Sequence, residues 1–211
     1  WNDEDVLRIC DKIKLLIKSN NIRTSFHPSQ YTLLSSSDEK VLGNSIKDLE
    51  YHNRLSNLLG NDTILIHCGG KYGDMYKAMN NIINNFNNLN QDIKNKLHLE
   101  NDDKTYNVEE TLFICEMLDI PMILDVHHDR CLGSILPVDL YIGRIIKTWK
   151  GNKPKCHLSS GKLSDNDKSH ADYITNYDYK YALELTQGKF DIMLESKCKD
   201  LALLQLLKFC N

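Results

Sequence analysis

Six short apolar runs in this chain each end on a histidine or an acidic residue. We predict a strand for each run, at 22–28, 63–70, 97–100, 121–129, 153–160 and 190–197. The residues that end these runs, or follow within three positions, are His27, His67, Glu100, Asp125 with His128, His157 and Glu195. Segments with helical spacing of apolar residues separate the runs. Short apolar strands that alternate with amphipathic helices indicate a parallel sheet covered by helices.

The helix signals lie between the predicted strands. The spacing from Val6 to Ile17 predicts a first helix. Ser36 with Glu39, and Asn107 with Glu110, match the capping box that opens a helix. Pro137 suits a first helical position. The order of elements is therefore α followed by β, repeated along the chain.

The same order limits the choice of fold. No glycine-rich phosphate loop follows any predicted strand, so nothing supports an open sheet that binds nucleotides. A repeat of roughly 25 to 40 residues suits a barrel. We predict an α/β fold of the (β/α)8 TIM-barrel type, formed by residues 1–211 as a single domain that lacks roughly its first two strands. An open, doubly wound sheet is the alternative.

The residues at the strand ends suggest a metal cluster. In a parallel barrel all strand carboxyl ends reach one rim, so side chains distant in sequence converge there. One histidine at a strand end is more often a hydrogen-bonded core residue, but six successive runs end in this way. Buried carboxylates and imidazoles cost several kcal/mol each unless they are paired or coordinated. Three carboxylates and four histidines exceed one tetrahedral ion, which predicts two or three Mn²⁺, Zn²⁺ or Fe²⁺ ions.

The charge of the chain bears on its partner. The net charge of -3 and the pI near 6.2 provide no basic field for a nucleic acid. Bound cations would supply that charge, and they suit phosphodiester hydrolysis because they activate water and stabilise phosphate charge. Loop cations could also contact phosphates or be ordinary surface charges: Lys71, Lys104, Arg130, Lys162, Lys168 and Lys197.

The cysteines and the apolar runs bear on location. The seven cysteines form no CxxC pair, so we expect reduced thiols and an intracellular protein of the cytoplasm or nucleus. No apolar run has the length of a membrane span, and the first residues resemble no signal peptide. We therefore expect no membrane partner.

Several motifs together resemble the UV damage endonuclease family. They are "HPSQY", "YHNRL", "HCGG", "LENDD", "NVEE", "LDVHHD", "KCHLSS" and "LESKCKD", in family order from about Ile22 to Asp200. The "ENDD" and "HPxQ" elements are more specific than the general Glu, Asp and His pattern shared with endonuclease IV and sugar isomerases. The resemblance implies a barrel with a Mn²⁺ cluster that nicks duplex DNA 5′ to UV photoproducts, namely cyclobutane dimers and 6-4 photoproducts.

The resemblance also implies residue roles. The metal ligands would be His27, His67, Glu100, Asp125, His128, His157 and Glu195. Lys155 matches a family lysine beside the metals, and His170 would lie near the scissile phosphate; with Glu100 these form the expected catalytic set. Gln30 and Tyr31 would belong to a wedge inserted opposite the lesion, where an aromatic ring stacks on exposed bases.

Residues beside the expected ligands would support them. Asn101 and Asp102 would orient Glu100 or its neighbours, whereas Asp103 is expected to be ordinary loop. His127, next to His128, would be a supporting donor.

Two departures from the family pattern affect these expectations. Ser29 stands where the family usually has glycine, which leaves Gln30 and Tyr31 in place. The family's N-terminal segment, with two strands, further DNA-probing residues and one more histidine ligand, is absent from the sequence given. We therefore expect a partial barrel with an incomplete cluster.

Three alternatives stay open. The chain could be an AP-endonuclease of the endonuclease IV type, a sugar isomerase or epimerase, or an inactive DNA-binding remnant. A sugar enzyme gives no reason for the Gln30-Tyr31 tip. We expect a monomer, since repair nucleases of this kind need no partner subunit to build the site.

Overall fold

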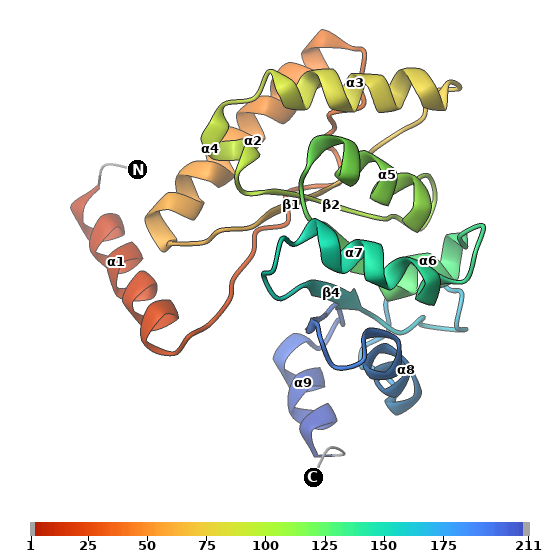
Figure 1. The fold of residues 1–211 in the computed structure, drawn as a ribbon. Coiled ribbons are helices and arrows are strands. Elements are labelled where there is room, and N and C mark those ends of the chain that lie inside the picture. Colours follow the sequence, from red (N-terminus) through yellow and green to blue (C-terminus); the bar gives the residue numbers. More distant parts are fainter. Residues whose placement is uncertain (1–2, 209–211) are drawn as a thin grey trace. The chain divides into compact units, whose positions relative to one another are not determined.

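The structure is a computed structural model that describes residues 3–208 (Figure 1). The first elements are α1 (Glu4–Ser19), α2 (Glu39–Leu59), β1 (Ile64–His67), α3 (Met75–Asn87), α4 (Gln91–Lys94) and β2 (Leu97–Glu100). They are followed by α5 (Val108–Leu118), β3 (Met122–Asp125), α6 (Val126–Leu132), η1 (Val138–Tyr141), α7 (Ile142–Thr148), β4 (Lys155–Leu158), α8 (Asn176–Thr186), β5 (Asp191–Leu194) and α9 (Lys199–Leu207). Packing divides the chain into two compact units, of which the first ends at His98 and the second begins at Leu99.

The first unit is organised around β1. Residues Ile64 to Ile66 are fully buried, and Phe26 forms an isolated parallel bridge with Ile64. The Ile64 amide donates to the Lys96 carbonyl at 2.7 Å, immediately before β2. The strand predicted at 22–28 is therefore wrong except for that bridge. The run ends at Pro28, which has no amide proton with which to extend a ladder.

The helices of the first unit begin where short polar side chains cap them. The carboxylate of Asp38 accepts the Lys40 and Val41 amides, so Asp38 opens α2 and the predicted capping box at Ser36 is wrong. The Ser36 hydroxyl instead accepts the Asp38 amide at 3.1 Å. α1 forms as predicted and packs against α2, with Cys10 as its buried residue.

The second unit holds a parallel sheet. Within it the order is β2-β3-β4-β5, and each strand pairs with the next one in the chain. β2, β3 and β4 are buried along their whole length, whereas β5 is partly exposed. α5 and α7 lie side by side and pack against β3 (Figure 1). The predicted parallel sheet is confirmed, although residues 3–208 contain five strands rather than six.

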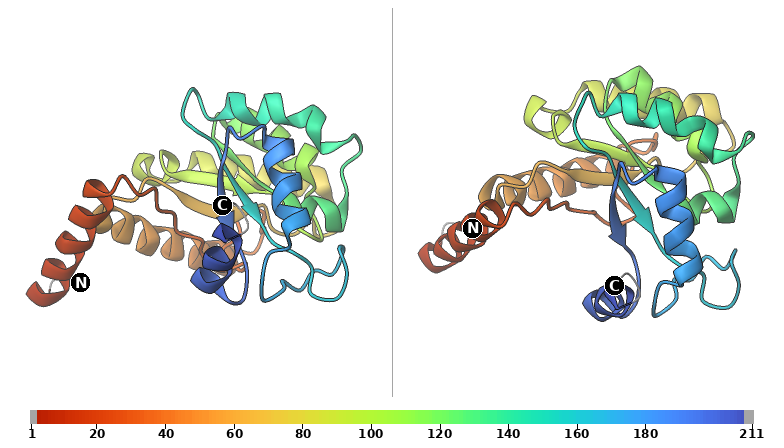
Figure 2. Two further views of the ribbon diagram at one scale, coloured as in Figure 1. Left: turned by 90° about the horizontal axis from the view of Figure 1, so that it is seen from below. Right: turned by 60° about the horizontal axis from the view of Figure 1, so that its bottom comes forward.

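The connections of the second unit place helices next to strand ends. Asn107 and Glu110 form the predicted capping box at the start of α5, with both reciprocal hydrogen bonds present. Pro137 precedes the short 3-10 helix η1 and is not itself a first helical residue. Figure 2 shows α8 beside β4, and α9 after β5, from two further directions. Among the helices of residues 3–208, none is both long and apolar enough to cross a membrane.

A polar network fastens α2 to α4 in the first unit. The Asp92 carboxylate accepts from Asn53 at 2.9 Å, from Asn57 at 2.7 Å and from Lys96 at 2.5 Å. Hydrogen bonds from Lys96, Asn57 and Asn53 together lower the pKa of Asp92 to about 2, against a burial cost. The Asp92 carboxylate is half exposed, so its net contribution is small.

This network predicts an acid-dependent loss of stability. Because the pKa of Asp92 is lower in the folded chain, its stabilisation is complete above the unfolded value of 3.8 and is lost as the pH falls towards about 2. Asp92→Asn should lower the urea midpoint of unfolding at pH 6. The difference in midpoint between this variant and the parent chain should become smaller below pH 4. The control is Asp11→Asn, on the exposed side of α1. A gap that stays constant with pH would contradict this account of Asp92.

Candidate metal centre

Three predicted ligands meet at the ends of β2, β4 and β5. Nδ1 of His157 lies 2.7 Å from Oε1 of Glu100 and 2.8 Å from Oε1 of Glu195. Glu100 is the last residue of β2, and its side chain is fully buried. Glu195 follows β5, where its amide donates to the Leu158 carbonyl at 2.9 Å. Parallel pairing thus brings residues from three separate segments together.

A second group shares Glu100. One potential ligand atom each from Glu100, Asp125 and His128 lie within 4.8 Å of one another. β3 runs directly into α6, and the Asp125 carboxylate caps that helix by accepting the His128 amide at 2.7 Å. The cap folds the chain back, so Nδ1 of His128 lies 3.4 Å from Oδ2 of Asp125.

Asn101 fixes the backbone beside this group. Its amide group donates to the Asp125 carbonyl at 2.9 Å, and its oxygen accepts the Asp125 amide at 2.9 Å. Its own carbonyl lies 3.0 Å from Nδ1 of His128. The fully buried Asn101 therefore bridges β2 to β3 and orients Asp125, which agrees with the role expected for it.

The two acidic residues that follow shape the loop rather than the ligands. The Asp102 carboxylate accepts the amides of Lys104, Thr105 and Tyr106, which closes a tight turn. The Asp103 carbonyl accepts a hydrogen bond from Nζ of Lys168 at 2.5 Å. Lys168 thereby ties two loops of the second unit, a contact that no sequence motif indicates.

The buried groups shift one another's protonation. Burial raises the pKa of Asp125, and the charges of Glu100 and Glu195 raise it further against the opposing effect of His128. Burial opposes charge on His157, but Glu100 and Glu195 outweigh it and hold the pKa of His157 well above its usual value. Without a cation, protons on the imidazoles balance the carboxylates. A cation must displace those protons, so its affinity should fall as the pH falls.

Two catalytic candidates of the second unit remain: His170, which lies beside this cluster, and Lys155, which lies two residues before His157. Nδ1 of His170 is 3.9 Å from Oε2 of Glu195, and its ring centroid is 6.1 Å from that of His128. Lys155, the first residue of β4, is 2% exposed and alternates onto the same side of the strand as His157. The second unit therefore places Glu100, Asp125, His128, His157, Glu195 and His170 close to one another, and Lys155 on the same strand as His157.

The site residues predicted for the first unit form their own group. The rings of His27 and His67 are 5.1 Å apart between centroids. His67 is the last residue of β1, and His27 follows the Phe26 bridge. In the loop that follows His27, Gln30 is exposed and Tyr31 is 75% exposed. An exposed tip of this kind can meet a large partner.

Two charged or imidazole groups near the cluster have partners within the protein. His127 is fully buried, and its Nε2 lies 2.9 Å from the Asp167 carbonyl. Burial lowers the pKa of His127. Arg130, expected among the cations that contact phosphates, forms an ion pair of 2.7 Å with Asp178. Sequence reasoning missed Asp178, since no local motif marks it.

The donors present fit divalent cations. Glu100 and Asp125 are fully buried, and within residues 3–208 Oδ2 of Asp125 accepts no hydrogen bond, although Nδ1 of His128 lies 3.4 Å from it. Carboxylates and imidazoles form a mixed oxygen and nitrogen set suited to Mn²⁺, Zn²⁺ or Fe²⁺. A cation would neutralise carboxylates whose burial is otherwise costly. This cluster is therefore a candidate metal centre.

The loop that carries His170 packs so closely against Gly161 that it leaves no room for a side chain there. A Cβ at this position would overlap the Ser164 carbonyl oxygen and lie 3.1 Å from that of Asp167. Gly161→Ala should therefore force the loop backbone to move and lower the free energy of unfolding by about 1–3 kcal/mol. The matched control is Gly143→Ala in α7, where a Cβ meets nothing within 4 Å. Urea unfolding measures both, and equal stabilities would contradict the prediction.

Comparison with known proteins gives one consistent family. The model of the UV-endonuclease UvdE family matches residues 2–211. A UV DNA damage endonuclease of Bacillus mycoides (strain KBAB4) is 41% identical over 204 residues, which cover 93% of this chain and 64% of that protein. A second UV DNA damage endonuclease, from Bacillus velezensis, is 41% identical over 208 residues, which cover 92% of this chain and 63% of that protein. The chain thus spans less than two thirds of the length of these curated relatives.

Solved structures agree on the fold. The crystal structure of SacUVDE matches 98% of this chain and 71% of its own, with a TM-score of 0.90 and 31% identity. The match to a D-tagatose 3-epimerase-like protein covers 95% of this chain and 80% of that protein, with a TM-score of 0.70 and 14% identity. The match to endonuclease IV from Thermus thermophilus covers 95% of this chain and 81% of that protein, with a TM-score of 0.65 and 15% identity. The predicted TIM-barrel type of α/β fold is confirmed.

Proposed function

The chain belongs to the UV-endonuclease UvdE family, and we propose on this basis that it is a metal-dependent DNA repair endonuclease. The proposed reaction is hydrolysis of the phosphodiester backbone 5′ to cyclobutane dimers and 6-4 photoproducts in duplex DNA. The observation that carries the proposal is the position of Glu100. Its buried carboxylate contacts His157 at 2.7 Å and also belongs to the group with Asp125 and His128.

The chain's own residues would hold the cations. Two or three Mn²⁺ ions, or alternatively Zn²⁺ or Fe²⁺, would be bound by His27, His67, Glu100, Asp125, His128, His157 and Glu195. When bound, such ions lower the pKa of a coordinated water and neutralise charge on the phosphate. The partly exposed Glu195 and the buried Glu100 would both contribute oxygens beside His157.

The neighbouring residues would orient the reacting groups. Asn101 holds the backbone of Asp125, and the His128 amide holds its carboxylate, so that Asp125 would stay directed towards the centre. His170, partly exposed and 3.9 Å from Glu195 through Nδ1, would direct Nε2 to a phosphate oxygen and donate a hydrogen bond there. The buried ammonium of Lys155 would balance negative charge beside the ligands.

Lesion recognition would come from the exposed tip after Phe26. Tyr31 is three-quarters exposed, so its ring can stack on bases that a damaged duplex leaves unpaired. The amide of Gln30 would fill the gap beside it. The partner is then damaged double-stranded DNA bound by a monomer, in which the bound cations supply the positive charge that the chain lacks overall.

A panel of substrates tests the proposed function. The 211-residue chain, loaded with Mn²⁺, should nick duplexes that contain one cyclobutane dimer or one 6-4 photoproduct, and should leave undamaged duplex intact. Preferred cleavage at an apurinic site would favour an endonuclease IV-like activity. Turnover of a ketose or aldose without nicking would favour an epimerase. Binding of damaged duplex without nicking would favour an inactive DNA-binding remnant.

A further inference from the structure

Segment 159–175 connects β4 to α8. Its two ends, at Ser160 and Thr175, form the base of the segment, and the carboxylate of Asp178 joins them. The Ser160 hydroxyl donates to Oδ2 of Asp178, and the Thr175 hydroxyl donates to the same oxygen at 2.8 Å. The Thr175 amide donates to the Ser160 hydroxyl at 3.0 Å. The Asp178 amide donates to the Thr175 hydroxyl at 3.1 Å. Both ends of the segment therefore meet at Asp178.

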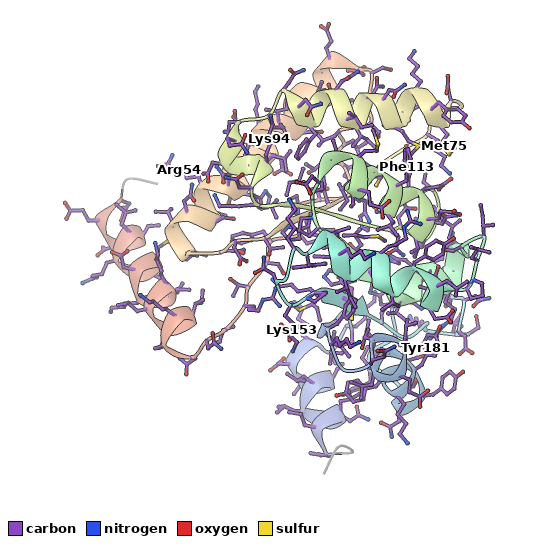
Figure 3. All side chains as sticks on the ribbon, viewed as in Figure 1. Arg54, Met75, Lys94, Phe113, Lys153 and Tyr181 are labelled. Atoms are coloured by element: carbon purple, nitrogen blue, oxygen red, sulfur yellow. The ribbon has the colours of Figure 1, made fainter. Side chains whose placement is uncertain are left out.

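The same carboxylate reaches α6, the helix that carries His128. Nη2 of Arg130 lies 2.7 Å from Oδ1 of Asp178, and the two side chains are 18% and 3% exposed. The guanidinium also lies 6.0 Å from the ring centroid of Tyr181, which α8 presents (Figure 3). Breaking a buried pair from one side leaves the other charge uncompensated, so this contact resists opening.

Backbone hydrogen bonds link the stretch around His170 to Ser160 and its neighbours. Gly161 and His170 form an antiparallel bridge. The Ala171 amide donates to the Ser160 carbonyl at 2.8 Å, and the Lys162 amide donates to the Ser169 carbonyl at 2.8 Å. Any displacement of Ser160 therefore moves the backbone of His170.

Two further contacts hold the outer part of the segment. The His127 ring contacts the Asp167 carbonyl at 2.9 Å, and Lys168 donates to the Asp103 carbonyl at 2.5 Å. These contacts hold residues 167 and 168, whereas the base at Ser160 and Thr175 depends on Asp178. Burial opposes the charge of Asp178, but hydrogen bonds from Ser160, Thr175 and Arg130 outweigh it and lower its pKa.

We propose that Asp178 is a positioning residue, whose carboxylate closes the base of segment 159–175, ties it to α6 through Arg130, and so fixes His170 beside Glu195 and His128. The catalytic consequence rests on the proposed function, whereas the structural consequence does not. Asp178 does not contact the substrate; it acts through the position of His170.

Hydrogen exchange tests the structural part without any need for activity. In Asp178→Ala the amides of residues 160–174 should exchange about tenfold faster or more, while those of α5 and β3 should keep their protection. The matched control is Glu184→Ala, an exposed position on the same helix. Unchanged exchange in 160–174, or equal acceleration throughout residues 99–208, would overturn the proposal.

A double-mutant cycle tests the catalytic part. Asp178→Ala should lower the rate of dimer incision about 10- to 100-fold in the parent chain, but less than about twofold in a His170→Ala background, because the two changes remove one contribution. An equal factor in both backgrounds would overturn the route through His170. Absence of incision by the parent chain would refute the proposed function, and hydrogen exchange would still decide the structural role.

A milder variant covers the case in which Asp178→Ala fails to fold. Thr175→Val keeps the shape of the side chain and leaves the Arg130 ion pair intact, but removes the hydroxyl that joins the end of the segment to Asp178. It should accelerate exchange of the same amides by a smaller factor. Exchange in 160–174 identical to that of the parent chain would overturn the proposal.

Discussion

Replacement of Glu100 by glutamine should reduce the rate of dimer incision about 10³-fold or more. Glutamine keeps the size of the side chain but removes the negative charge that both groups of the candidate metal centre share. A neutral amide also meets His157 at 2.7 Å, where a carboxylate now balances the imidazole. An effect of this size is consistent with electrostatic stabilisation, for which loss of one group costs about 10²–10³ in rate, added to weaker binding of cations.

The control for this prediction is Glu184→Gln, which makes the same chemical change at an exposed position of α8. It should leave the incision rate within about twofold of the parent value, as surface substitutions usually change little. Circular dichroism and urea unfolding show whether Glu100→Gln is folded. A folded Glu100→Gln with the parent rate of incision would remove Glu100 from the site.

Addition of Mn²⁺ should raise the unfolding temperature by about 5–10 °C. A ligand that binds only the folded chain at about 100 times its dissociation constant stabilises by about 2.7 kcal/mol. Each kcal/mol corresponds to about 2–4 °C for a chain of this length. The physical reason is that a cation neutralises Glu100 and Asp125, which are fully buried. Calorimetry before and after treatment with a chelator measures the shift.

The shift should depend on the proposed ligands. Glu100→Gln should abolish most of it, whereas Glu184→Gln should retain it. The shift should also shrink as the pH falls, since protons held by His157 and His128 compete with the cation. An unfolding temperature that Mn²⁺ does not change would contradict a metal centre at these residues, independently of any activity.

The convergence of side chains in the second unit could be predicted from the sequence because parallel strands present their carboxyl ends at one edge. Three of the residues lie at or near the end of a short buried strand, namely Glu100, Asp125 and His157. This regular placement can be recognised in the sequence itself. The parallel order and the fold type follow from the same alternation of strands and helices. The resemblance to the UV damage endonuclease family is confirmed by the comparisons.

The errors lie where local signals compete. Ser36 and Asp38 are both residue types that can cap a helix. Asp38 is the N-cap of α2 because its carboxylate accepts the amides of Lys40 and Val41. The apolar run at 22–28 looked like a strand, but only Phe26 pairs and Pro28 follows. Each error concerns a boundary or a marginal element rather than the architecture.

The contacts that the sequence could not predict depend on tertiary structure. Arg130 looked like a loop cation for phosphates, yet it pairs with Asp178 on another helix. Lys168 likewise donates to the carbonyl of Asp103, which looked like ordinary loop. Neither partner lies within the spacing that helix or turn rules address, so only the folded chain reveals that these residues hold the loop of His170.

The most direct test of the central claim is incision of an end-labelled duplex that contains a single cyclobutane dimer. With Mn²⁺ the 211-residue chain should produce one nick, at the phosphodiester 5′ to the dimer, and with a chelator it should produce none. Glu100→Gln should give no nick under either condition, and Glu184→Gln should match the parent chain. Equal nicking with and without Mn²⁺, or no nick by a chain that binds Mn²⁺, would contradict the account of a metal-dependent UV endonuclease centred on Glu100.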